Sequence, residues 1–267
     1  MDPRKLIIVL MALVIIVPIA AYSVYYYEQP KLKIIKDGST VSLWYYGYII
    51  VDGTDLIFDT NMASVANNNT TYPKAPDFTY HPPFTPLNDT VGSGQMIKGF
   101  DQGLIGMAQG QSGIIVVPPN LGYGNINESL ISKINISGYV SINQELTFNQ
   151  FTSLFKVFPV NGELLTSPIY GWPVKVTSYN QYYVYIQNIP QIGVQYFPYQ
   201  GISGFSIIPD SINSNNTISY YFAVTNGTIL PNGAYISYVG STYFELNKNQ
   251  YLAGKTLYFY VDIIKVD

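Results

Sequence analysis

The sequence predicts an α+β protein in which an antiparallel β-sheet wraps around one short helix and a large β-rich unit is inserted. Two observations carry this prediction. Apolar residues alternate in a strand-like way from Ile34 to the end of the chain, whereas only one segment outside the insert has a clear helical period. A third observation, an uncharged apolar segment near the N-terminus, adds a transmembrane helix to the expected fold.

Composition excludes several classes of function. The chain has 267 residues, a net charge of −3, no cysteine and a single histidine, His81. We therefore expect no nucleic-acid binding, no thiol catalysis and no thiolate or multi-histidine metal site. Charged residues make up only 11% of the chain, against roughly 25% in an average domain, so hydroxyl and amide groups must solvate much of the surface.

The N-terminal segment predicts a membrane anchor. Leu6 to Tyr27 is uncharged and would span about 33 Å as a helix, enough for the hydrocarbon core of a bilayer. Arg4 and Lys5 precede it, so the positive-inside rule places residues 28–267 outside the cytoplasm of a single-pass protein of the cell membrane. A cleaved signal peptide is the alternative, although the segment ends in a poor small-x-small cleavage site. The expected boundaries are a cytoplasmic stub at 1–5, the anchor at 6–27 and a stem at 28–33.

Glycosylation signals agree with this placement. The triplet Asn-x-Ser/Thr marks acceptor sites in exported proteins, although a chain rich in these residues also produces it by chance. It occurs at Asn68, Asn69, Asn88, Asn127, Asn135, Asn215 and Asn226. Export is common to the anchor and to the cleaved signal.

After the stem, the sequence predicts two strands and a long loop. Thr40 to Ile50 alternates apolar and polar residues, and Asp52-Gly53 is a tight-turn signal before the apolar run Leu56 to Phe58. Residues 61–86 are polar and rich in proline, without a helical period, and predict a loop.

The clearest helix candidate in this part lies from Gly99 to Ala108. Phe100, Leu104 and Met107 form one apolar stripe, and Gly110 is placed to end the helix. Ile114 to Val117 predicts a buried strand. Residues 257–263 predict a last strand with one inward face.

The composition changes between about residues 125 and 250. Charges become sparse, while Asn/Ser clusters and tyrosine-rich alternating runs such as Tyr179 to Ile186 predominate. We interpret this segment as a separate β-rich unit inserted into the first domain. The expected boundaries are 34–125 for the first part of that domain, 126–249 for the insert and 250–267 for its second part.

Five groups of short motifs carry a family resemblance. They are Trp44 to Gly47 with Val51 to Thr54 and Phe58 to Thr60, then Val91 to Asp101, Met107 to Gln111, Leu121 to Gly124 and Leu257 to Val266. In this order they resemble the opening strands, the loop into the single helix, the exit from that helix, the Tyr-Gly element and the closing strand of FKBP-type peptidyl-prolyl isomerases. The resemblance implies an FKBP-like fold for these two pieces of the chain.

The interruption after Tyr123-Gly124 is similar to that of SlyD-like and archaeal long members of the family. Those members carry an insert-in-flap chaperone domain at this place, and Asn249 to Gly254 resembles the segment by which they return. The insert here is about twice as long as the resemblance implies. Its inner part, about 165–230, has no counterpart in that domain.

The resemblance implies a peptidyl-prolyl cis-trans isomerase that acts on exported or unfolded proteins and needs no nucleophile, metal or cofactor. The implied catalytic groups are Asp59, which supports the twisted carbonyl, and two donors to substrate carbonyls, the Tyr123 hydroxyl and the Ile97 backbone N–H. Phe100, where the best-known members have Trp, would form the floor of the proline pocket. The implied walls are Tyr45, Phe58, Leu87, Met96, Ile97 and Phe259.

Periodicity alone favours simpler interpretations of the same residues. Strand aromatics such as Phe58 are ordinary core, Asp59 is a turn residue, and His81 is an exposed loop side chain. The alternative functions are a non-catalytic FKBP-like chaperone or binding module on the cell surface, and a structural surface protein. We expect a monomer whose partners are proline-containing polypeptides and, through its anchor, the membrane.

Overall fold

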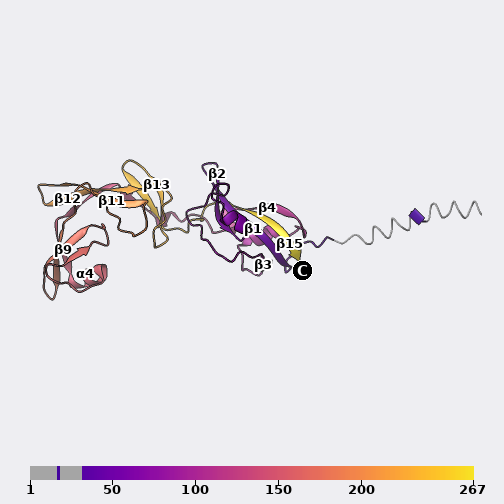
Figure 1. The fold of residues 1–267 in the computed structure, drawn as a ribbon, viewed down its shortest axis with the longest axis horizontal. Coiled ribbons are helices and arrows are strands. Elements are labelled where there is room, and N and C mark those ends of the chain that lie inside the picture. Colours follow the sequence, from indigo (N-terminus) through magenta and orange to yellow (C-terminus); the bar gives the residue numbers. More distant parts are fainter. Residues whose placement is uncertain (1–16, 19–31) are drawn as a thin grey trace, which may run out of the picture.

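The computed structural model describes residues 17–18 and 32–267 (Figure 1). The expected stub lies outside the described residues, as do all but two residues of the expected anchor and most of the stem. Within the part that is described, no helix is both long enough and apolar enough to cross a membrane.

One antiparallel sheet is built from both ends of the described chain. Its strand order is β2-β1-β15-β4, and β3 also pairs with β1 (Figure 1). The central strands β1 and β15 pair from Val41 opposite Val266 to Tyr48 opposite Tyr258. The bounds are Thr40–Val51 for β1, Thr54–Thr60 for β2, Leu87–Thr90 for β3, Ser112–Val117 for β4 and Leu257–Val266 for β15.

Alternation along these strands gives the sheet one buried face. The helix α3, Lys98–Leu104, packs on that face through Phe100 and Leu104, which are fully buried. From β15, Leu257, Phe259, Val261 and Ile263 point into the same core, so the predicted inward face of the last strand is confirmed. The antiparallel sheet and the short helix α3 agree with the predicted α+β class.

The helix is shorter than its apolar period predicts. It ends at Leu104 because Ile105 has extended backbone, with ψ of 128°, and Gly106 has φ of 90°, a left-handed conformation that favours glycine. Met107 therefore packs against the core from the turn after the helix. A 3.6-residue period cannot distinguish these two placements.

The segment predicted as a buried strand is an edge strand. In β4, Ile115 and Val117 are buried, whereas Ile114 and Val116 are 59% and 56% exposed. The prediction of burial on both faces was wrong because an edge strand can expose two β-branched side chains. The predicted loop at 61–86 also contains a short helix, α2, at Ala63–Ala66.

Tyrosine rings cover the other face of the central strands. Tyr46 stacks on Tyr260 with ring centroids 5.0 Å apart, and Tyr48 stacks on Tyr258 at 5.2 Å. These pairs lie directly opposite one another on β1 and β15. Cross-strand aromatic pairs stabilise a sheet, so tyrosine occupies positions that charged residues often hold.

Residues 131–247 form three further antiparallel sheets, at the opposite end of the molecule from β3 and β15 (Figure 1). Their strand orders are β7-β10-β9-β8, β11-β12-β6 and β13-β14-β5. The helix α4, Phe148–Phe155, begins at a capping box formed by Thr147 and Gln150. The bounds of the strands are Ile131–Asn135 (β5), Ser137–Ser141 (β6), Asn143–Thr147 (β7), Leu164–Thr166 (β8), Pro173–Tyr179 (β9), Tyr183–Asn188 (β10), Phe205–Ile212 (β11), Thr217–Val224 (β12), Tyr235–Val239 (β13) and Tyr243–Asn247 (β14).

The chain leaves the first sheet and returns to it at one place. Gly254 N–H donates to the Gly124 carbonyl over 2.8 Å. The Asn249 side chain accepts from the backbone N–H of Asn127 and donates to its carbonyl, each over 3.0 Å. These bonds lie beside the boundaries expected at residues 125 and 250, which themselves stay predictions.

A pair of buried carboxyl groups lies between β3 and α3. Asp89 is 3% and Asp101 6% exposed, and three of their four carboxyl oxygens have no hydrogen-bond partner among the described residues. The remaining oxygen, Asp101 Oδ2, accepts from the Gly92 N–H over 3.1 Å. Burial raises the pKa of Asp101, the Gly92 N–H opposes this, and Asp89 and Asp37 raise it further.

We expect the Asp89/Asp101 pair to make stability depend on pH. Because the pKa of Asp101 is higher in the folded protein than in the unfolded chain, its contribution is fully present below the ordinary carboxyl pKa. It is lost as the pH rises through the raised value. In Asp89→Asn an amide replaces one of the two buried carboxyl groups and offers a donor to the other. This should stabilise the protein by about 1–3 kcal/mol at pH 7 and flatten the pH dependence.

Urea unfolding of wild type and Asp89→Asn between pH 3 and pH 8 measures this difference. Asp55→Asn, at an exposed site on β2, is the matched control and should follow the wild type. Equal loss of stability with rising pH in wild type and Asp89→Asn would contradict the prediction.

Candidate functional site

Four aromatic rings meet on the buried face of the sheet. Phe259 lies 5.5 Å from Phe58 and 5.0 Å from Phe100 between ring centroids, and both pairs are T-shaped. Tyr45 lies 6.0 Å from Phe100. The rings come from β1, β2, α3 and β15, so the pairing of the strands assembles this cluster.

Gly47 leaves room for two of these rings. A Cβ at this position would lie 2.5 Å from the Phe58 ring and 2.9 Å from that of Phe259. The glycine lies on β1 between Tyr46 and Tyr48, and its missing side chain lets the aromatic rings pack against the backbone.

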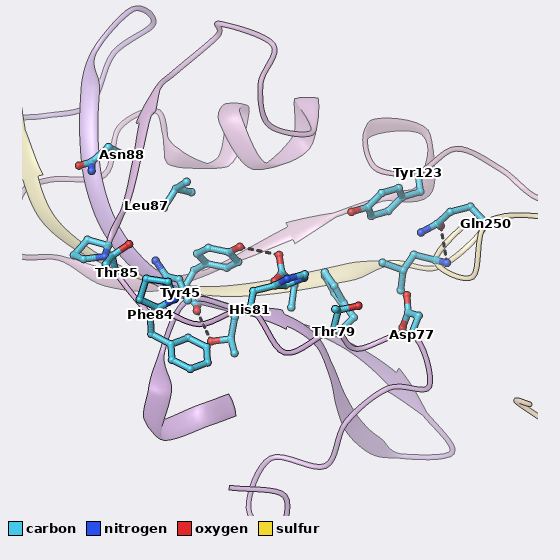
Figure 2. Close-up of a pocket in the computed structure, with 17 residues that line it drawn as sticks. Tyr45, Asp77, Thr79, His81, Phe84, Thr85, Leu87, Asn88, Tyr123 and Gln250 are labelled. Atoms are coloured by element: carbon cyan, nitrogen blue, oxygen red, sulfur yellow. Dashed lines mark hydrogen bonds between the residues drawn. The ribbon is translucent and has the colours of Figure 1, made fainter. Parts of the chain in front are cut away.

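Tyr45 and Asp59 are joined by a hydrogen bond. The Tyr45 hydroxyl donates to Asp59 Oδ2 over 2.7 Å (Figure 2). Burial, reinforced by the Asp59 carboxylate, raises the pKa of Tyr45 far above its ordinary value, so this hydroxyl stays protonated and remains a donor. The bond fixes the direction of the Asp59 carboxylate at the end of β2.

At the end of β2, the side chains of Thr60 and Asn61 continue the pairing with β1. Asn61 Oδ1 accepts from the Tyr45 N–H over 2.7 Å, and Asn61 Nδ2 donates to the Leu43 carbonyl over 3.0 Å. Thr60 Oγ1 donates to the Tyr45 carbonyl over 2.8 Å. Tyr45 is thus held through its backbone as well as through its hydroxyl.

An open pocket of about 620 Å³ lies above this cluster (Figure 2). Five of the residues that the sequence predicts for the site line it, namely Tyr45, Phe58, Asp59, Leu87 and Tyr123. Phe100 and Phe259 do not line it; both are almost fully buried, and their rings lie against those of Tyr45 and Phe58. Met96 and Ile97 pack on the same core without lining the pocket.

Two predicted donor groups have no partner among the described residues. The Tyr123 hydroxyl accepts from and donates to no group there, and the Ile97 N–H, at the N-cap of α3, is also unpaired. Burial raises the pKa of Tyr123, and the carboxylates of Asp59 and Asp77 raise it further. Its hydroxyl is therefore a protonated donor that faces the pocket (Figure 2).

Several residues that line the pocket were not predicted from the sequence. Asp77, Thr79, His81 and Phe84 come from the segment between β2 and β3 that the sequence predicts as a loop. His81, which we expected to have no role, is exposed but lies in this lining. The only indication in the sequence was that these residues come shortly before Leu87, which was predicted to line the pocket. Further lining residues are Thr60, Asn61, Pro83, Thr85, Pro86, Asn88, Gln250 and Leu252.

Two of the missed residues come from the segment that returns from the insert. Leu252 is buried, and its N–H is held by the Gln250 side chain over 2.7 Å (Figure 2). No motif in the sequence marks them as site residues. Tertiary structure alone places them in the same pocket as Asp59.

The part of the chain that forms this pocket is similar to a known family. Residues 32–149 match the family model for the FKBP-type peptidyl-prolyl cis-trans isomerase. The match continues past the expected boundary at residue 125 and does not include β15.

Curated relatives agree over part of the chain. The short-type peptidyl-prolyl cis-trans isomerase of Methanocaldococcus jannaschii is 35% identical over 103 residues, which are 39% of this chain and 59% of that protein. FK506-binding protein 1A of Neurospora crassa is 55% identical over 40 residues, 15% of this chain and 33% of that protein. Peptidyl-prolyl cis-trans isomerase FKBP2 of Mus musculus is 51% identical over 39 residues, 15% of this chain and 28% of that protein. The chain thus spans less than two thirds of these relatives.

We expect Gly47→Ala to disturb the aromatic cluster. The added methyl group collides with two rings that cannot both move, so the free energy of unfolding should fall by about 1–3 kcal/mol. Near-UV circular dichroism of the aromatic bands and urea unfolding would measure the change.

Gly113→Ala on β4 is the matched control. Its Cβ would meet only the mobile end of Met107, at 3.2 Å, so its stability should stay close to that of the wild type. Equal effects of the two substitutions would argue against a special packing role of Gly47.

Proposed function

We propose that this protein is a peptidyl-prolyl cis-trans isomerase for exported or unfolded polypeptides. The observation that carries the proposal is the pocket in which the Asp59 carboxylate, fixed by Tyr45, and the free Tyr123 hydroxyl flank a wall of aromatic rings. The FKBP-type family match over residues 32–149 supports the same reaction.

Amide chemistry explains how such a pocket accelerates rotation. The barrier of about 18–20 kcal/mol arises because rotation breaks the resonance of the X–Pro bond. Water stabilises the polar planar amide, so an apolar wall that removes water favours the twisted form. Donors such as the Tyr123 hydroxyl and the Ile97 N–H hold neighbouring substrate carbonyls, while Asp59 supports the twisted carbonyl.

The insert is the proposed chaperone part, of the SlyD-like or archaeal long type. Its described surface carries exposed apolar side chains that could hold unfolded chains, among them Tyr139, Phe158, Leu164 and Tyr182. The same surface supports the alternative, a non-catalytic FKBP-like chaperone or binding module on the cell surface.

We further propose a single-pass protein of the cell membrane whose residues 28–267 lie outside the cytoplasm, acting as a monomer. The uncharged segment Leu6 to Tyr27 and the basic residues before it support this placement, as do the glycosylation triplets. The membrane is then a partner through the anchor alone.

A proline-limited refolding assay with residues 32–267 tests the isomerase proposal. Wild type should catalyse the slow phase, and the Asp59→Ala/Tyr123→Phe double variant should lose on the order of 10- to 100-fold in kcat/KM, because two polar contacts to the reacting amide are removed.

The matched control is Asp55→Ala/Tyr258→Phe, which makes the same changes at an exposed site on β2 and on the tyrosine-covered face of the sheet, both outside the pocket. Suppressed aggregation without catalysis by the wild type would favour the binding module. Inertness in both assays would favour a structural surface protein.

Replacing residues 126–249 by a short turn tests whether isomerisation and the binding of unfolded chains belong to different parts of the chain. The bond between Gly254 and Gly124 places the two ends side by side, so a short connection can join them. The shortened chain should keep isomerisation of tetrapeptides but lose activity on unfolded protein. Equal loss of both, in a shortened chain that still shows cooperative unfolding, would argue against separate roles for the two parts.

A further inference from the structure

The side chains that line the pocket carry more negative than positive charge. Asp59 and Asp77 both line it, and no lysine or arginine does. An open pocket with low-dielectric walls and charge of one sign attracts ligands of the opposite sign. We propose that Asp77 makes the pocket select proline-containing segments with a lysine or arginine next to the proline. This inference rests on the proposed isomerase function.

Asp77 lines the pocket without being held by another side chain as Asp59 is. Asp59 accepts the Tyr45 hydroxyl, whereas Asp77 Oδ1 is buried and has no hydrogen-bond partner among the described residues. Burial raises the pKa of Asp77, its own backbone N–H and Lys255 oppose this, and Asp59 raises it further. A cation in the pocket would relieve the repulsion between the two carboxylates.

Lys255, the cation that lowers the pKa of Asp77, forms no ion pair with it in the described part of the chain. Lys255 Nζ donates to the Tyr251 carbonyl over 2.6 Å and lies 3.9 Å from the centre of the Tyr251 ring. The ion pairs of the described residues, formed by Lys33 and Lys265, both involve Asp267 and lie away from the pocket. Lys255 also lies 5.6 Å from the centre of the Tyr235 ring, so its contacts are with these two tyrosines rather than with Asp77.

The position of Asp77 places the selected charge beside the proline. In Figure 2 Asp77 and Tyr123 lie on the same side of the pocket, and Leu87 and Asn88 lie on the opposite side. A peptide whose carbonyl accepts from Tyr123 would bring a neighbouring side chain to Asp77. Selection would thus act on a residue that flanks proline rather than on the ring itself.

Exchange NMR of tetrapeptides tests the inference without a coupled protease. The peptides carry Lys, Leu or Glu before proline in one series and after it in the other. In at least one series kcat/KM should favour Lys over Glu by about tenfold in low salt, and 1 M NaCl should reduce the preference because it screens charge. Asp77→Asn should lower the preference to about twofold.

Two variants serve as controls. Asp55→Asn removes the same charge from an exposed site on β2 and should keep the wild-type preference. Asp77→Glu keeps the charge and should retain most of it, which separates charge from a structural role of the side chain.

The outcomes distinguish the two proposals. Catalysis with equal kcat/KM for Lys, Leu and Glu, or a preference that Asp77→Asn leaves unchanged, would overturn the inference and leave the isomerase function intact. Absence of catalysis with every peptide would overturn the isomerase function. In that case, titration calorimetry with the same peptides would show whether the pocket still binds the Lys peptides more tightly than the Glu peptides.

Discussion

The pairing of β1 with β15 is the contact on which the rest of the structure depends. It places Phe259 beside Gly47 and so brings the last strand of the chain against Phe58 and Phe100. Neither piece of the chain could form the aromatic cluster alone. The pocket above the cluster therefore exists only when residues separated by the whole insert have met.

A long insertion at this place costs little stability. The entropy of loop closure grows only with the logarithm of length, about 0.6 kcal/mol for each doubling. Here the cost is lower still, because bonds between the two connecting segments, such as those of Asn249 with Asn127, hold the ends together. The return segment then contributes Leu252 to the pocket, so the insertion also shapes the site.

In this sparsely charged chain, tyrosine side chains occupy positions where other proteins often have charged groups. Tyr45 orients Asp59, and stacked tyrosines cover the outer face of the central strands. The two carboxyl groups of Asp89 and Asp101 are the exception, since they lie buried between β3 and α3 and form no ion pair with any residue that the structure describes. Local polar contacts, rather than ion pairs, fix the geometry of the site.

The sequence by itself predicted four of the five strands of the first sheet, the inward face of β15 and five of the residues that line the pocket. These features follow from local alternation and from motifs that keep their order. It did not determine where the helix ends, because backbone conformation at Ile105 and Gly106 overrides the apolar period. Only the tertiary structure placed Asp77, His81 and Leu252 in the lining. A pocket is formed by segments distant in sequence, and no local pattern records which of their side chains face one another.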